Sequence, residues 1–219
     1  VERPAIRAGA PVEAIPQLNV ASVTLGELMQ TRFPPPDWLV RGLIERGKLA
    51  AIIGAPKSAK TWFAQEVALS VAAGLPVCEY PDFDGRQRAA KVYLWCVEDH
   101  KPDVQRRLVS LWEGRDTMPH DLENVKDNLR ILAGQRIDLM TREQFLQAVA
   151  TIRHDQGRPD LIVMDPFVDL VEFENENDAK QMSMAMERFR IIRDVFQCAV
   201  LLVHHAKKKG DGDKGKDVN

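Results

Sequence analysis

Eight consecutive residues in the first third of the chain have the types and spacing of a phosphate-binding loop. They are Gly54, Ala55, Pro56, Lys57, Ser58, Ala59, Lys60 and Thr61, which follow GxxxxGK[ST] with Ala59 in place of the second glycine. Such a loop turns backbone N–H groups toward a β-phosphate, and the following helix adds the positive end of its dipole. Lys60 then reaches the β- and γ-phosphates, and the Thr61 hydroxyl binds Mg²⁺. We expect this segment, extended to Trp62, to bind a nucleoside triphosphate with magnesium.

Ala59 stands where the pattern has a glycine. Alanine is tolerated there if its φ is negative, whereas a positive φ costs about 1 kcal/mol or more and lowers nucleotide affinity. The alternative interpretation of residues 54–61 is an ordinary surface turn. Their place between a predicted strand and a predicted helix favours the phosphate loop.

Short apolar runs alternate with helical periodicity after residue 47. The runs predict strands at residues 48–53, 91–97, 129–132, 161–164 and 199–203. Apolar spacing predicts helices at residues 61–73, 104–112, 141–152 and 178–196. This alternation predicts an α/β fold, in which helices cover both faces of a predominantly parallel sheet.

Polar side chains follow three more of the predicted strands. They are Glu98 and Asp99 after the second strand, Asp165 after the fourth, and His204 and His205 after the fifth. Ligands of open parallel sheets lie beyond the carboxyl ends of the strands, so we expect these side chains to surround the phosphate loop. Asp165 is expected to hold a water of the magnesium ion and to act on the metal together with Thr61.

Glu98 is the candidate general base that orients the attacking water, and Asp99 is the alternative base. His205 is expected to contact the γ-phosphate and sense its loss, while His204 packs or pairs. Zinc binding by the two histidines is not expected, because adjacent residues of a strand point to opposite faces. Lys60, Glu98 and His205 therefore form the predicted catalytic set.

The flanking segments differ in composition from the core. The composition of residues 1–37, rich in Pro and Ala, predicts an extended arm with a short helix near residues 25–29. The α/β core is expected at residues 38–206. A flexible loop of Lys, Gly and Asp is expected at residues 207–219. Lys207, Lys208 and Lys209 suit a phosphate of a neighbouring subunit, a nucleic-acid backbone or simple solvation.

The aromatic side chains have two interpretations. The spacing of Trp62, Phe63, Trp95 and Trp112 favours packing in the core over stacking on bases. Trp38 follows the proline run, where it would pin the arm to the core or lie near the adenine.

The composition excludes several classes of protein. Lys and Arg total 30 and Asp and Glu total 32, and the net charge of −2 excludes a wholly basic nucleic-acid coat protein. No run approaches the about 18–20 apolar residues of a membrane helix. The first residues have no signal-peptide core. Cys78, Cys96 and Cys198 are expected to be buried and reduced, as in a cytoplasmic protein without a membrane partner.

These segments together resemble the RecA-like P-loop ATPases. They are most similar to RepA-like plasmid and phage hexameric replicative helicases, which are AAA family ATPases related to DnaB and KaiC. The similar segments, from about Trp38 to Lys209, are PPDWLVRGLIERGKLAAIIGAPKSAKTWFAQEVALSVAAGLP, VYLWCVEDHKPDVQRRL, LIVMDPF, NENDA and VLLVHHAKK. The resemblance implies ATP and Mg²⁺ bound between subunits of a homo-oligomer, a hexameric ring that acts on single-stranded DNA.

The resemblance also assigns roles to individual residues. By similarity, Lys60 and Thr61 are the Walker A pair, Asp165 is the Walker B acid, Glu98 is the catalytic glutamate, His205 is the sensor, and Lys208 is a trans-acting basic residue. Ala59 implies slow hydrolysis. The family places its arginine finger on later strands, beyond Asn219, so we expect the core to be incomplete at its C-terminal end.

Three alternatives stay open on the residues alone. One is a KaiC-like or mediator-type protein, in which ATP controls assembly without unwinding. Another is a recombination or repair ATPase related to RecA, which pairs strands. The third is a P-loop domain that has lost ATP binding and serves as a scaffold.

Overall fold

The computed structural model describes residues 22–79, 88–172 and 178–205, and the chain divides into two compact units, Val1–Pro35 and Pro36–Asn219. In the first unit, α1 (Leu25–Gln30) confirms the short helix expected in the arm. Thr24 and Glu27 form a capping box, in which the Glu27 backbone N–H donates to Thr24 Oγ1 at 3.2 Å and the Thr24 N–H donates to Glu27 at 2.7 Å. All the residues of this helix are exposed to solvent.

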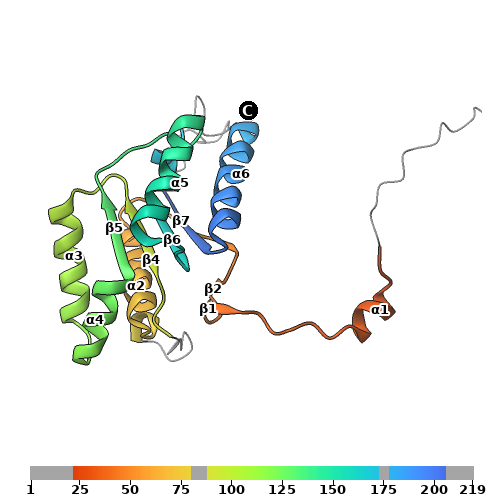
Figure 1. Ribbon diagram of the computed structural model, residues 1–219, viewed down its shortest axis with the longest axis horizontal. Helices are drawn as coiled ribbons and strands as arrows, with labels where there is room; N and C mark the ends of the chain where they lie inside the picture. The colour runs from red at the N-terminus through yellow and green to blue at the C-terminus, as the bar shows by residue number, and fades with distance from the viewer. Residues whose placement is uncertain (1–21, 80–87, 173–177, 206–219) are drawn as a thin grey trace, which may run out of the picture. The chain divides into compact units, whose positions relative to one another are not determined.

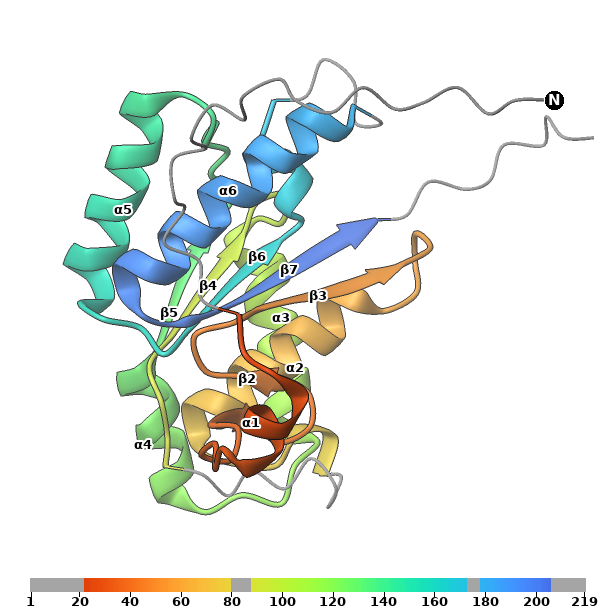
Figure 2. The same ribbon diagram turned by 90° about the vertical axis from the view of Figure 1, so that its right-hand side faces the viewer.

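A five-stranded sheet forms the centre of the second unit (Figures 1 and 2). Its order is β3 (Leu49–Gly54), β7 (Ala199–His205), β6 (Leu161–Asp165), β4 (Val92–Cys96) and β5 (Leu129–Ala133). Every neighbouring pair is parallel, and all five strands match runs that the sequence predicts. The predicted α/β fold class is therefore confirmed, and the carboxyl ends of the strands meet at one edge of the sheet.

Helices cover both faces of this sheet (Figure 1). One face carries α2 (Lys60–Ala73), α3 (Lys101–Glu113) and α4 (Pro119–Asn128), and the other carries α5 (Arg142–Gln156) and α6 (Ala179–Phe196). Strand β4 contributes to both cores because its side chains alternate in direction: Leu94 packs in the first cluster and Trp95 in the second. Strands β4 and β6 are buried along their whole length, which explains their apolar composition, whereas the edge strands β3 and β5 have exposed residues such as Ile53 and Arg130.

Some elements were not predicted from the sequence. They are β1 (Trp38–Val40), β2 (Ile44–Glu45), α4, and the short 3₁₀ segments η1 (Val77–Glu79) and η3 (Phe167–Leu170). Strands β1 and β2 form an antiparallel hairpin, and Arg46 just after it binds Asp160 at 2.7 Å. Because Asp160 immediately precedes β6, this hairpin lies near the amino ends of the strands. This placement favours packing of Trp38 against the core over a position near the adenine.

No helix in the described ranges is long and apolar enough to cross a membrane.

Candidate nucleotide-binding site

The predicted phosphate loop joins β3 to α2 and closes around its own lysine. Lys60 is the first residue of α2 and is only 5% exposed. Its Nζ donates to the Ala55 carbonyl oxygen at 2.6 Å and to Ser58 Oγ at 3.3 Å. A Cβ at Gly54 would lie 3.0 Å from Ser58 Oγ, closer than side chains normally approach. The loop is thus a tight cradle in which an ammonium group lies at the N-terminus of a 14-residue helix, an arrangement suited to phosphate.

Ala59 adopts the strained conformation that the sequence left open. Its φ is +61° and its ψ is +19°, in the left-handed region. Lys57, two residues earlier, also has a positive φ, of 63°. The Cβ of an L-residue crowds the backbone there, at a cost of about 1–2 kcal/mol. The phosphate loop is therefore formed at the expense of local strain at the N-cap of α2.

Replacing Ala59 with glycine is expected to stabilise the protein by about 1 kcal/mol, which raises the melting temperature by about 2–4 °C in a chain of this size. The physical reason is relief of the left-handed strain. Thermal unfolding followed by circular dichroism measures the change. Ala55 is the matched control, because it is not among the described residues with positive φ. Ala55→Gly should lower stability by about 0.4–1 kcal/mol. An equal loss of thermal stability in Ala59→Gly and Ala55→Gly would contradict the assignment of strain to Ala59.

The polar residues predicted at the strand ends come together at one edge of the sheet. Strands β3, β7, β6 and β4 are consecutive in the sheet. His205 is the register partner of Gly54, and Asp165 is the partner of Cys96. The Val97 N–H donates to the Asp165 carbonyl at 2.8 Å, which joins the tips of β4 and β6. Asp165 is 4% exposed. The side chain of His205 lies outside the described part of the structure.

Asp99 and Glu98 have different surroundings, although they are adjacent in sequence. Both carboxylate oxygens of Asp99 accept hydrogen bonds from Arg107 Nη1 and Nη2, the latter at 2.9 Å. Among the described residues, no ion pair with a basic side chain involves Glu98. The geometry therefore favours Glu98 over Asp99 as the group that can accept a proton from water.

Asp169 is a neighbour of Glu98 that the sequence did not single out. It lies on η3, and its Oδ1 binds Arg136 Nη2 at 2.7 Å. Partial burial raises the pKa of the Glu98 carboxyl, and a hydrogen bond with Asp169 and the negative charges of nearby aspartates raise it further. A raised pKa makes Glu98 a stronger base than an ordinary glutamate.

Arg107 is a second residue that the sequence did not single out. Besides binding Asp99, it lines a cavity of about 300 Å³ together with residues 57–62 of the phosphate loop. A guanidinium group thus lies beside the loop that holds Lys60. The sequence places Arg106 and Arg107 in one predicted helix but does not say which of them turns toward the loop.

A family model and a solved structure are similar to this chain. The family described as AAA domain matches residues 15–211, which is most of the chain. The chain belongs to this AAA domain family. No curated protein sequence matches it.

Among solved structures, this AAA domain is similar to a KaiC-like protein, PH0186, from the hyperthermophilic archaeon Pyrococcus horikoshii OT3. The TM-score is 0.51 at 14% sequence identity, and the match covers 79% of this chain and 68% of the archaeal one. This similarity is one of fold. Together with the sheet order, it shows that the chain has the RecA-like P-loop fold of an AAA-type ATPase.

The oxygen atoms of the AAA domain site suit magnesium better than zinc. Thr61 offers a hydroxyl at the start of α2 and Asp165 a buried carboxylate at the end of β6. Magnesium takes oxygen ligands and retains waters and phosphate oxygens, so two protein groups suffice. The described residues contain no group of three His, Cys, Asp or Glu side chains placed to hold a metal.

The tryptophans and cysteines of the AAA domain differ in burial. Trp62 is 42% exposed, so its interpretation as a core residue is wrong, whereas Trp95 is fully buried. Cys78 is exposed, so the expectation of three buried cysteines is wrong for this residue. Burial raises the pKa of the Cys96 and Cys198 thiols to about 12. Lys207, Lys208 and Lys209 lie outside the described residues.

His204 packs, as expected. Its ring lies 5.1 Å from the ring of Phe167, centroid to centroid.

Proposed function

We propose that this protein is a Mg²⁺-dependent ATPase motor, a replicative helicase of the RepA-like type that acts on single-stranded DNA. One observation carries the ATPase part of the proposal: four consecutive parallel strands bring the phosphate loop, Asp165 and Glu98 to the same edge of the sheet. The helicase part is supported by the order of the sequence segments shared with RepA-like proteins. The net charge of −2 gives it no support.

In the proposed mechanism, each side chain of the site has a separate role. The loop amides and the α2 dipole hold the β-phosphate, while the Lys60 ammonium neutralises negative charge on the transferred phosphoryl group. Glu98 orients the attacking water and accepts its proton, and its raised pKa favours that transfer. Thr61 and Asp165 hold the magnesium ion, which supplies positive charge to the phosphates. His205, beside Gly54 in the register, relays the state of the γ-phosphate to the residues that follow.

The proposal includes neighbouring subunits. A homo-oligomer, most simply a hexameric ring, places each site at a subunit boundary, and one of Lys207, Lys208 and Lys209 contacts either the next subunit's γ-phosphate or the DNA backbone. The second candidate function is a KaiC-like or mediator-type protein in which ATP controls assembly without unwinding. The strain at Ala59 favours this candidate, because a distorted phosphate loop suits a slow switch better than a fast motor.

ATP hydrolysis measured with and without single-stranded oligonucleotide separates the two functions. A helicase should show DNA-stimulated turnover and an affinity that falls steeply with salt, since phosphate contacts release counterions. The mass in solution with and without ATP is measured in parallel, and double-stranded DNA serves as the control polymer. ATP hydrolysis that DNA does not stimulate, together with a mass that changes with ATP, would support the KaiC-like or mediator-type function. A monomer with full activity would contradict the site between subunits.

A further inference from the structure

The carboxylate of Asp169 has one buried oxygen atom without a donor among the described residues. This side chain lies on η3 and is 16% exposed. Its Oδ1 binds Arg136 Nη2 at 2.7 Å, whereas its Oδ2 is buried and accepts no hydrogen bond from the described part of the chain. Buried polar atoms nearly always have a partner. An open acceptor beside a proposed active site therefore points to a role in the reaction.

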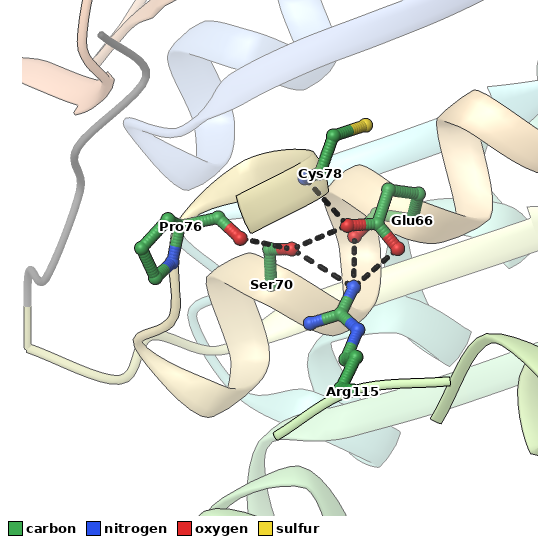
Figure 3. Close-up of polar contacts among 5 residues, drawn as sticks. All are labelled: Glu66, Ser70, Pro76, Cys78 and Arg115. Atoms are coloured by element: carbon green, nitrogen blue, oxygen red, sulfur yellow. Dashed lines mark hydrogen bonds and ion pairs between the residues drawn. The ribbon is translucent and has the colours of Figure 1, made fainter. Parts of the chain in front are cut away.

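Glu66 on α2 shows how the same protein satisfies a buried carboxylate outside the predicted catalytic set (Figure 3). Its side chain is 10% exposed and forms an ion pair with Arg115 through Oε2. Its Oε1 accepts from the Cys78 N–H at 2.7 Å and from Ser70 Oγ at 3.2 Å. Both oxygens of Glu66 thus have donors, whereas one oxygen of Asp169 does not.

Packing holds Asp169 in place at the tip of β6. Phe167 is buried, and its ring centroid lies 5.5 Å from that of Phe189 on α6. Leu170 is also buried, and its carbonyl oxygen accepts from the Leu139 N–H at 2.8 Å. Because the residues on both sides are anchored, Asp169 keeps its position and does not turn into solvent.

Glu98 is the carboxyl group within hydrogen-bond reach of Asp169. It follows Val97, whose N–H joins the tips of β4 and β6 by donating to the Asp165 carbonyl oxygen. Two ionised carboxylates offer each other only acceptors, whereas a Glu98 that has taken up a proton gains an O–H donor. The contact between Glu98 and Asp169 is therefore repulsive before proton transfer and becomes a hydrogen bond after it.

Other charged and titratable side chains lie on the described segments near this pair. They are Lys60 on α2, Asp99 and His100 after β4, Arg107 on α3, Arg136 after β5, and Asp165 at the end of β6. Among the charged groups, Asp169 raises the Glu98 pKa most, and Asp165 and Asp99 raise it less. The ion pair with Arg136 favours a negative charge on Asp169, so the proton belongs on Glu98.

We propose that Asp169 is a positioning residue for ATP hydrolysis, whose Oδ2 accepts the hydrogen bond that Glu98 donates once it has taken the proton of the attacking water. This inference rests on the proposed ATPase function, because Glu98 must act as the base. In that step a water O–H bond breaks, its proton passes to Glu98, and the water oxygen bonds to the γ-phosphorus as the bond to the ADP oxygen breaks. Asp169 thus stabilises the base only as the proton arrives, which lowers the barrier.

Asp169→Asn tests the proposal, because Arg136 should retain the carbonyl oxygen and leave the amide nitrogen in the place of Oδ2. An amide N–H donates to ionised Glu98 and so stabilises the state before proton transfer. We expect kcat to fall about tenfold, the equivalent of about one pKa unit, while KM for Mg²⁺–ATP stays unchanged. The acidic limb of the kcat–pH profile should move down by about one pH unit, because hydrolysis needs ionised Glu98 and its pKa falls when the charge of Asp169 is lost.

A double variant separates this role from a merely structural one. Asp169→Asn added to Glu98→Gln should cause no further loss of hydrolysis, because the first change acts through the base that the second removes. Asp127→Asn is the matched control, since Asp127 is an exposed aspartate on α4, and it should leave kcat and the pH profile unaltered.

Arg136→Gln provides a variant that does not depend on how Asp169→Asn folds. Its side chain is 69% exposed, so its loss should not affect folding, and kcat should fall about two- to fivefold at constant KM as Asp169 loses its ion pair. Circular dichroism melting is measured for every variant. Unchanged kcat in folded Asp169→Asn, unchanged kcat in Arg136→Gln, or a further tenfold loss in the double variant would overturn the role of Asp169 and leave the proposed ATPase intact. Absence of hydrolysis by the unaltered protein would instead contradict the ATPase itself.

Discussion

Replacing Lys60 with alanine should lower the rate of ATP hydrolysis by roughly 10²–10³-fold, because the variant loses the ammonium group that meets developing charge on the phosphates. The structure places this ammonium inside the loop, within 2.6 Å of the Ala55 carbonyl oxygen. A cation fixed there requires little reorganisation when negative charge develops. Release of inorganic phosphate at saturating ATP and magnesium measures the effect.

The control for Lys60→Ala is Lys91→Ala. Lys91 is exposed and directly precedes β4, at the opposite edge of the sheet. This variant should hydrolyse ATP at the rate of the unaltered protein. Circular dichroism melting of both variants excludes unfolding as the cause. Unchanged turnover in a folded Lys60→Ala variant would remove the proposed site.

Replacing Glu98 with glutamine should lower hydrolysis by roughly 10²–10⁴-fold while ATP still binds. Glutamine keeps the shape of the side chain but cannot accept the proton of the attacking water. Binding is measured by calorimetry with Mg²⁺–ATP, and turnover by phosphate release. Lys60→Ala and Glu98→Gln therefore differ in kind, since the first removes a phosphate contact and the second removes a base.

Two matched variants accompany Glu98→Gln. Glu113→Gln makes the same change at an exposed residue on α3 and should leave turnover unaltered. Asp99→Asn tests the alternative base directly. Its carboxylate is held by Arg107, so we expect a smaller loss than at Glu98. A larger loss of turnover at Asp99, with ATP binding retained, would transfer the role of base to Asp99.

The alternating architecture could be predicted because its causes are local. The central strands β4 and β6 are buried on both faces and are therefore apolar, as in the run that contains Leu94 and Trp95. The other three strands were recognised as short apolar runs between helical segments. The meeting of the strand tips followed from the parallel arrangement alone. The phosphate loop was recognised because its chemistry depends on the order of consecutive residues, which a sequence displays directly.

The remaining features depend on which distant side chains meet. Arg107 and Asp169 reach the site from α3 and η3, and the sequence does not say which way a helical side chain turns. The φ of Ala59 depends on the shape of the whole loop. Cys78 is exposed in a segment where its own φ is positive and its N–H donates to Glu66 of α2. Neither feature has a sequence pattern.

The position of β3 at an edge of the described sheet has a mechanical consequence. Within the described residues, β3 is hydrogen-bonded to one strand, β7, through the pairs from Leu49–Val200 to Gly54–His205. A displacement of the carboxyl end of β7 therefore reaches the phosphate loop through a single ladder of backbone bonds, and no second neighbouring strand resists it. A displacement of the tip of β7 can thus change the shape of the phosphate loop and its affinity for a ligand.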